Sequence, residues 1–291
     1  MQKNRKIVTT GTFDGVHRGH CKVLDFMKER GVVLGLAPVV VTFDRHPLEV
    51  IAPERAPKLL MSPDDRDAAL SALGVKVLRL GFDESLRRLT AAEWLRRMRQ
   101  ADVEVVVVGY DNTFGCDGRS LGLEDYFRLG REENVAVEEA PVLQGVSSTL
   151  VREALAGGRV EEAARMLGRP YTVAGAVVHG RHLGRELGFP TANVDHDIRM
   201  VLPASGVYAA EVAMPDGTLR IAVVNVGTRP TVSNGNDISL EAHIPDFRGD
   251  LYGKDVSVRF IRRIRDERKF GSADELRGAI RADIEALRKI Q

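Results

Sequence analysis

The sequence predicts an α/β protein in two parts, a parallel β-sheet covered by helices and then an antiparallel β-barrel with a C-terminal helix. Three observations predict this. The chain has 291 residues, more than one hydrophobic core usually serves. Its first half alternates β-branched runs with helical stretches, the rhythm of a parallel sheet. Its second half holds five or six strand-like runs with no helix between them, which is typical of an antiparallel barrel.

The strands of the first half are short β-branched runs. Between them, Ser62 with Pro63 and Thr90 with Glu93 are N-terminal helix signals, an N-cap followed by Pro and a capping box. This pattern predicts a Rossmann-like sheet, whose ligands bind beyond the carboxyl ends of the strands, where the strand order reverses. The strands are expected at residues 6–10, 39–43, 75–80, 103–109 and 135–138.

A helical pair, broken at Gly157 and Gly158, follows over residues 147–167. Gly168-Arg169-Pro170 then ends the helical region. We therefore expect two domains, 1–169, which includes linker helices at 148–168, and 170–291.

Turn residues punctuate the second half. The segment 214–218, Met-Pro-Asp-Gly-Thr, predicts a hairpin turn. Barrel strands are expected at 171–179, 207–213, 219–225, 238–244 and 256–261. The tail 273–290 predicts one amphipathic helix, whose apolar stripe comprises Leu276, Ile280, Ile284 and Leu287.

Composition and charge narrow the function. The net charge is +1, and residues 170–291 carry 17 Lys/Arg against 16 Asp/Glu, so we expect no nucleic-acid partner. The basic stretch 262–269 is interleaved with Asp266 and Glu267, which favours a solvated, loop-anchoring cluster. Two isolated cysteines, Cys21 and Cys116, and no signal-peptide or membrane-spanning run predict a cytoplasmic protein without a membrane partner.

The most informative motif is the histidine pair His17 and His20, which follows the first strand. At the first turn of a helix the two imidazoles point to the same side as the free N–H groups and the positive end of the helix dipole. Nearby glycines let a polyphosphate approach the backbone, so the motif predicts nucleotide chemistry. Two alternatives remain, a pair of surface or capping histidines and a zinc site completed by a distant residue such as His46.

A second motif is the hydroxyl-rich stretch 146–152. Ser148 or Thr149 can cap the helix that follows, and a plain cap is one interpretation. Arg152 shares a face with both hydroxyls and can clamp a phosphate beside the helix N-terminus, which is the interpretation we favour.

The third motif, 180–193, alternates glycines and arginines and ends in Thr191-Ala-Asn193. Such a loop can wrap phosphates, and two side-chain oxygens suit a Mg²⁺ ion held mainly by ATP. A glycine-rich barrel loop without a ligand is the alternative. Downstream, strand alternation over 238–244 places Glu241 and His243 on one face. A carboxylate there can accept a proton from an attacking hydroxyl, although an isolated Glu on a strand is more often just solvated.

Together these stretches resemble the prokaryotic family of bifunctional riboflavin kinase/FMN adenylyltransferases, also called FAD synthetases. The matching segments, in order, are 11–20, 41–47, 109–115, 146–152 with 168–171, 180–193 and 239–254. In the segment 109–115, Asn112-Thr113 departs from the commoner Phe-Arg of the family's flavin-side loop.

The resemblance implies two activities. A kinase domain, 170–291, would phosphorylate riboflavin with ATP to give FMN and ADP. An adenylyltransferase domain, 1–169, would join FMN to a second ATP to give FAD and pyrophosphate. Mg²⁺ would accompany ATP, and we expect a monomer or weak homo-oligomer.

The resemblance also implies site residues. The catalytic ones are Glu241 as base, His17, His20 and Arg152. Phosphate or ATP contacts are expected from Gly11, Thr12, Phe13, Gly15, Gly19, Ser147, Ser148, Thr149, Gly180, Arg181, Gly184, Arg185, Gly188 and Pro190. Flavin contacts are expected from Asp44, His46, Asp111, Asn112 and Phe114. Thr191 and Asn193 would hold Mg²⁺.

Three other functions remain open. An adenylyltransferase of another substrate, with a barrel that only binds a ligand, would need neither Glu241 nor the Thr191–Asn193 motif. A non-catalytic flavin or nucleotide sensor would not need both histidines and Arg152. A nucleic-acid-binding protein is the weakest alternative, given the balanced charge of both halves.

Overall fold

The computed structural model describes residues 5–110, 113–180, 188–228 and 238–289. Two compact units, Met1–Ser148 and Thr149–Gln291, have their own internal contacts. The predicted linker helices thus group with the second unit, while the predicted division into domains at residue 169 stays a prediction.

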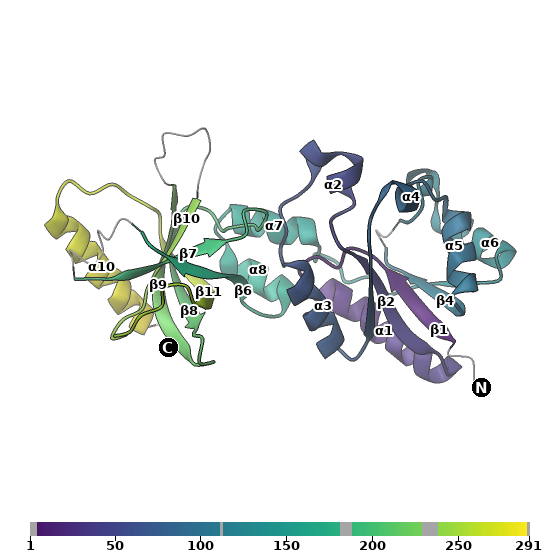
Figure 1. Ribbon diagram of the computed structural model, residues 1–291, viewed down its shortest axis with the longest axis horizontal. Coiled ribbons are helices and arrows are strands. Elements are labelled where there is room, and N and C mark those ends of the chain that lie inside the picture. Colours follow the sequence, from purple (N-terminus) through teal and green to yellow (C-terminus); the bar gives the residue numbers. More distant parts are fainter. Residues whose placement is uncertain (1–4, 111–112, 181–187, 229–237, 290–291) are drawn as a thin grey trace. The chain divides into compact units, whose positions relative to one another are not determined.

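The first unit is built on a five-stranded parallel sheet of order β3-β2-β1-β4-β5, which confirms the predicted fold class (Figure 1). Each predicted strand is present, with ends shifted by at most two residues. The strands are β1 (Lys6–Thr10), β2 (Ala37–Phe43), β3 (Lys76–Leu80), β4 (Val103–Val108) and β5 (Ala136–Glu139). The helices are α1 (Arg18–Leu34), α2 (Leu48–Ile51), α3 (Pro63–Ala72), α4 (Glu84–Arg87), α5 (Ala91–Gln100) and α6 (Leu123–Glu132), with 3₁₀ turns η1 (Pro53–Arg55) and η2 (Gly118–Ser120).

Helices cover both faces of this sheet, because successive residues of a strand point to opposite sides. Ile7 packs in one core with helices α1 and α3, whereas Val8 packs in another with α5 and α6 (Figure 1). Local capping fixes where two of the helices begin. Ser62 accepts a hydrogen bond from Asp65 N, and Thr90 forms the predicted capping box with Glu93.

The strand order decides where ligands can bind. β1 lies between β2 and β4, and the chain passes from β1 outward to β2 and β3 before it crosses back to β4. The reversal of strand order therefore lies at the carboxyl ends of β1 and β4. The loops that follow β2, β1 and β4 leave from the same edge of the sheet.

The second unit is a closed antiparallel barrel of order β10-β7-β6-β11-β8-β9. Its strands are β6 (Tyr171–Val178), β7 (Thr191–His196), β8 (Gly206–Ala213), β9 (Leu219–Thr228), β10 (Ile238–His243) and β11 (Asp255–Arg265). Helices α7 (Ser148–Ala156) and α8 (Val160–Leu167) precede the barrel, and α8 packs on β11 and β6. The strand β7 was not predicted, because its Thr-Ala-Asn-Val-Asp-His sequence lacks an apolar stripe.

The C-terminal helix α10 (Ala273–Arg288) packs on the outside of β9, as the amphipathic pattern predicts. Leu287 and Ile284 lie against Val223. A bidentate ion pair also joins α10 to β11, since Arg265 Nε and Nη2 donate to the Asp283 carboxylate at 2.9 and 2.8 Å. Asp283 is only 4% exposed, whereas the Arg265 side chain is partly exposed, so the carboxylate is the shielded member of the pair.

Across the described ranges, no helix has both the length and the apolar character needed to span a membrane.

We expect Asp283→Ala to lower the free energy of unfolding of the second unit by about 3 kcal/mol, because Arg265 loses a buried partner. Urea unfolding followed by far-UV circular dichroism measures this loss. The single tryptophan, Trp94, lies in the first unit, so its fluorescence transition should stay unchanged. The matched control is Asp274→Ala, which breaks an exposed pair with Arg277 on the same helix and should cost about 0.5 kcal/mol or less. Equal losses in the two variants would contradict the prediction.

Candidate functional site

The two histidines of the first motif are stacked at the N-terminus of α1. Their ring centroids lie 3.6 Å apart with an interplanar angle of 15°. His17 is the N-cap of α1, and its Nδ1 accepts a hydrogen bond from His20 N at 3.2 Å. The capping interpretation is therefore correct for His17, and it is compatible with phosphate binding because it fixes the ring at the positive helix end. Gly19 leaves room for the His17 ring, since a Cβ at this position would lie 3.1 Å from it, a tight contact.

One imidazole of the pair is held neutral in the free protein. Burial, and then the neighbouring His17, lowers the pKa of His20 well below the usual 6.5. His20 is therefore neutral at pH 7 in the ligand-free protein. Its Nδ1 is buried and has no hydrogen-bond partner among the described residues. Such a nitrogen is available to a ligand.

The loop between β1 and α1 is held in an unusual backbone conformation. Phe13 and Val16 have φ of 48° and 40°, and Gly15 has φ of 80°. A positive φ is costly for the β-branched Val16, so the surroundings must enforce it. Phe13 and Val16 are buried in the α1 core, and the Asp14 carboxylate accepts Leu60 N at 3.0 and 3.1 Å.

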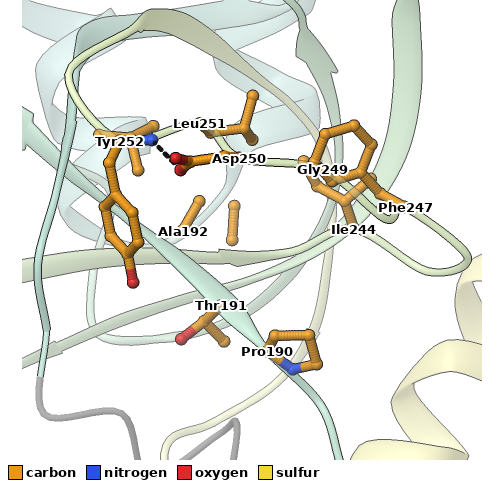
Figure 2. Close-up of a pocket in the computed structure, with 11 residues that line it drawn as sticks. Pro190, Thr191, Ala192, Ile244, Phe247, Gly249, Asp250, Leu251 and Tyr252 are labelled. Atoms are coloured by element: carbon orange, nitrogen blue, oxygen red, sulfur yellow. Dashed lines mark hydrogen bonds between the residues drawn. The ribbon is translucent and has the colours of Figure 1, made fainter.

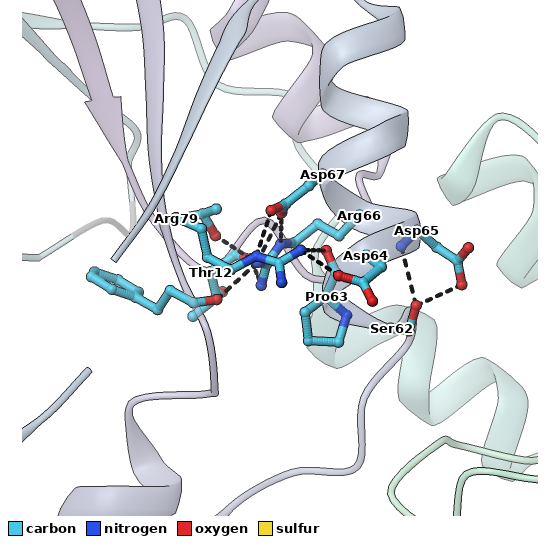
Figure 3. Close-up of polar contacts among 10 residues, drawn as sticks. Thr12, Ser62, Pro63, Asp64, Asp65, Arg66, Asp67 and Arg79 are labelled. Carbon is cyan, nitrogen blue, oxygen red and sulfur yellow. Dashed lines mark hydrogen bonds and ion pairs between the residues drawn. The ribbon is translucent and has the colours of Figure 1, made fainter. Parts of the chain in front are cut away.

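A buried arginine joins the ends of β1 and β2 (Figure 3). Arg66, on α3, donates from Nη2 to Phe43 O at 2.8 Å and from Nη1 to Thr12 O at 3.5 Å. Asp67 holds the guanidinium at 3.0 Å and in turn accepts from Arg79 at 2.6 Å. The start of two candidate loops is thus tied to one side chain, which the sequence did not single out.

Gly11 and Thr12, two predicted phosphate contacts, extend the first strand toward this edge. Gly11 N donates to Val41 O at 3.0 Å, and Thr42 Oγ1 donates to Thr12 O at 3.4 Å. The main chain of both residues is therefore fixed before the strained loop begins.

Asp44 and His46, two predicted flavin contacts, follow β2. Burial alone would raise the pKa of Asp44, but the hydrogen bond from Phe82 N and the Arg45 guanidinium outweigh it and lower the pKa. His46 Nδ1 accepts Leu48 N at 3.2 Å, which orients the ring. Both residues lie in the loop that follows β2, at the carboxyl edge of the sheet.

Of the flavin contacts predicted after β4, Phe114 is described and is 8% exposed. Asp111 and Asn112 lie outside the described residues. No third ligand completes a zinc site with the histidines: among described residues, no group of three or more His, Cys, Asp or Glu could hold a metal ion.

The hydroxyl-rich motif begins α7, as predicted. Ser148 Oγ donates to Asp14 O at 2.9 Å, so it contacts the histidine loop. Ser147 directly precedes the helix. Thr149 and Arg152 lie on the first turns of α7, and Arg152 is on the same helix face as Ser148.

In the barrel, the predicted site residues Thr191, Asn193 and Glu241 lie on two neighbouring strands, together with His243. Glu241 on β10 lies directly opposite Asn193 on β7, and His243 lies opposite Thr191. Alternation puts all four residues on one face of the sheet, as the sequence predicts for Glu241 and His243. On its other side Glu241 faces Asn225 of β9. Leu240 and Ala242, on the opposite face of β10, are fully buried.

The glycine-arginine loop is described only at its ends, and Arg181, Gly184 and Arg185 lie outside the described residues. Gly180 packs against the Asn193 carboxamide, which would have to move to admit a Cβ at residue 180. Gly188 has φ of 87°. Pro190 O contacts His243 Nδ1 at 2.9 Å, which fixes the approach to Thr191.

Thr191 also lines a cavity of about 370 Å³, within the range of small-molecule sites (Figure 2). Aromatic and small side chains surround it, and within its lining Asp250 accepts a hydrogen bond from Tyr252 N, two residues further along the chain, at 2.9 Å. The Tyr252 ring stacks on His179 at 3.9 Å. The cavity lining is Val177, Pro190, Thr191, Ala192, Ala242, Ile244, Phe247, Gly249, Asp250, Leu251 and Tyr252. Glu241 is not part of this lining, whereas a position facing the barrel mouth was expected.

The donor set of the barrel fits a magnesium ion carried by ATP. Thr191 and Asn193 offer a hydroxyl and a carboxamide oxygen from the same face of one strand. Mg²⁺ takes oxygen ligands and keeps several water or phosphate ligands, so it needs few ligands from the protein.

Comparisons with known proteins agree with this architecture. A family described as FAD synthetase matches residues 1–152, and one described as riboflavin kinase matches residues 167–291. A bifunctional riboflavin kinase/FMN adenylyltransferase of Pseudomonas fluorescens is 41% identical over 98% of this chain and 92% of its own length. One of Escherichia coli K12 is 38% identical over 95% and 90%.

A solved structure supports the fold. The crystal structure described as a macrolide-efflux protein from Streptococcus pneumoniae is 32% identical, covers 99% of this chain and 95% of its own, and has a TM-score of 0.87. From the matches in both halves, the chain belongs to the family of bifunctional riboflavin kinase/FMN adenylyltransferases.

Proposed function

We propose that this protein makes flavin cofactors in two steps, phosphorylating riboflavin to FMN and then adenylylating FMN to FAD. The observation that supports this proposal most strongly is that one chain contains two separate groups of polar side chains, one in each unit. The stacked His17 and His20 lie at a helix N-terminus in the first unit, and Thr191, Asn193 and Glu241 share a barrel face in the second. The relatives with the same domain order bear the names of both activities.

In the kinase step, Glu241 accepts the proton of the riboflavin 5′-hydroxyl. The hydroxyl oxygen bonds to the γ-phosphorus of ATP, and the bond from that phosphorus to ADP breaks. Thr191 and Asn193 would hold Mg²⁺, which supplies neutralisation of the phosphate charge. The phosphates of ATP are bound by the glycine-arginine loop, through Gly180, Arg181, Gly184, Arg185, Gly188 and Pro190. The cavity beside Thr191 receives part of a substrate.

In the adenylyltransferase step, an FMN phosphate oxygen bonds to the α-phosphorus of ATP, and pyrophosphate leaves. No protein nucleophile is needed, so positioning and electrostatics supply the catalysis. His17, His20 and Arg152 stabilise the phosphate charge, and Ser147, Ser148 and Thr149 bind the β/γ side. The loop Gly11, Thr12, Phe13, Gly15 and Gly19 approaches the triphosphate. Asp44, His46, Asp111, Asn112 and Phe114 contact the flavin.

We place the adenylyltransferase in residues 1–169 and the kinase in 170–291. The protein acts in the cytoplasm, as a monomer or weak homo-oligomer, without a nucleic-acid partner. Its two cysteines are free, as expected of a reducing compartment, and both halves of the chain are nearly neutral.

Replacing Glu241 with Gln should reduce kcat for riboflavin phosphorylation by at least about a hundredfold, because the base is lost. FAD formation from supplied FMN should be unchanged. Separation of flavins by chromatography measures both rates. The control is Glu211→Gln, which removes a half-buried carboxylate of β8 that pairs with Arg259 and should leave both rates intact. Wild-type phosphorylation by the Glu241 variant would show that the base is a different residue.

His17→Asn should reduce FAD formation about a hundredfold while riboflavin phosphorylation persists. Asparagine is a good N-cap, so this variant keeps the helix start and removes only the imidazole. His20→Gln should have a similar effect. Measuring both reactions on the same preparations separates lost chemistry from misfolding, because a misfolded chain would lose both. Unchanged FAD formation in both variants would contradict the assignment.

Binding of ATP should be coupled to proton uptake by His20. Burial and His17 hold the pKa of His20 below 6.5 in the free protein, and a bound triphosphate raises it by its negative charge. Between these two pKa values the site gains a proton on binding. Titration calorimetry at about pH 6, in buffers of different ionisation enthalpy, counts the protons. Wild-type protein should take up more protons than His20→Gln; equal uptake would refute the coupling.

A further inference from the structure

A single tyrosine hydroxyl holds both main-chain groups of Phe114, the proposed flavin contact after β4. Tyr126 OH accepts Phe114 N at 3.1 Å and donates to Phe114 O at 3.0 Å. The two rings also touch, with centroids 4.5 Å apart at 45°. Tyr126 lies on α6, so a helix outside the candidate site sets the conformation of a residue within it.

This pair of hydrogen bonds cannot be exchanged for water at low cost. Tyr126 is 3% exposed and packs with Phe114 and Trp94 in one apolar core. Phe114 belongs to no strand or helix, so its N–H and C=O need a partner from elsewhere. Burial raises the pKa of Tyr126, so the hydroxyl keeps the proton that it donates to Phe114 O.

The residues after Phe114 are tied to the same helices. Cys116 N donates to Leu89 O at 2.7 Å, just before α5. Asp117 Oδ1 accepts Ala91 N at 2.8 Å, at the first residue of α5. Tyr126 therefore belongs to a set of contacts that fixes this segment, and it is the member that acts on Phe114 itself.

We propose that Tyr126 is a positioning residue of the adenylyltransferase reaction, which fixes the main chain at Phe114 and thereby the ring that contacts the flavin. The inference rests on the proposed function of the first unit. Tyr126 does not touch the histidines, so its hydroxyl contributes to binding of FMN rather than to charge stabilisation on the phosphates.

The test is Tyr126→Phe in the full-length chain, with both reactions measured. We expect KM for FMN to rise about tenfold, the size expected when a buried hydrogen-bond partner is removed. The kcat at saturating FMN should stay within about twofold of wild type, and KM for riboflavin in the kinase reaction should not change. Partial unfolding would do the opposite, since less folded enzyme lowers the apparent kcat and leaves KM unchanged.

The matched control is Tyr171→Phe, which removes another buried hydroxyl that donates to a main-chain oxygen, Val201 O in the barrel. This variant should leave KM for FMN at the wild-type value. An unchanged KM for FMN in Tyr126→Phe, or an equal rise in both variants, would overturn the inference. A wild-type chain that makes no FAD from FMN and ATP would instead refute the proposed function.

Discussion

The central position of β1 is the constraint on which the first unit depends. Ile7 and Val8 are buried on opposite faces of this strand, so apolar layers on both sides hold it in the centre of the sheet. With β2 and β4 as its neighbours, three loops must leave from one edge of the sheet. The strained loop, the histidine pair and the proposed flavin contacts all lie in loops that leave this edge. Burial of the apolar strand residues fixes the main chain from which their polar side chains extend.

In the barrel, strand pairing rather than loop position brings the polar side chains together. In an antiparallel sheet, residues that lie opposite each other on adjacent strands point to the same face. Glu241 therefore forms one polar row with Asn193 on one side and Asn225 on the other. Their neighbours Leu240 and Ala242 are buried and fix the register. His20 and Asn193 are neutral and Asp44 is hydrogen-bonded, which suits sites whose strongest charges arrive with the substrate.

Much of the fold could be predicted from the sequence, because its signals are local. The caps at Ser62 and Thr90 depend on residues three positions apart, and strands β1, β2 and β4 contain runs of β-branched residues. Strand β7 could not be predicted, since only its pairing with β6 and β10 makes it a strand. The contacts of Arg66 and Tyr126 could not be predicted from the sequence for the same reason. Each reaches a main-chain group on a distant segment, and neither leaves a spacing pattern.

The most direct measurement is a time course of the purified chain with riboflavin, ATP and Mg²⁺, in which flavins and nucleotides are separated at each point. The account predicts that FMN and ADP appear first, and that FAD and pyrophosphate follow at the expense of FMN. Riboflavin that remains unchanged would contradict the account, and so would FMN that accumulates without any FAD.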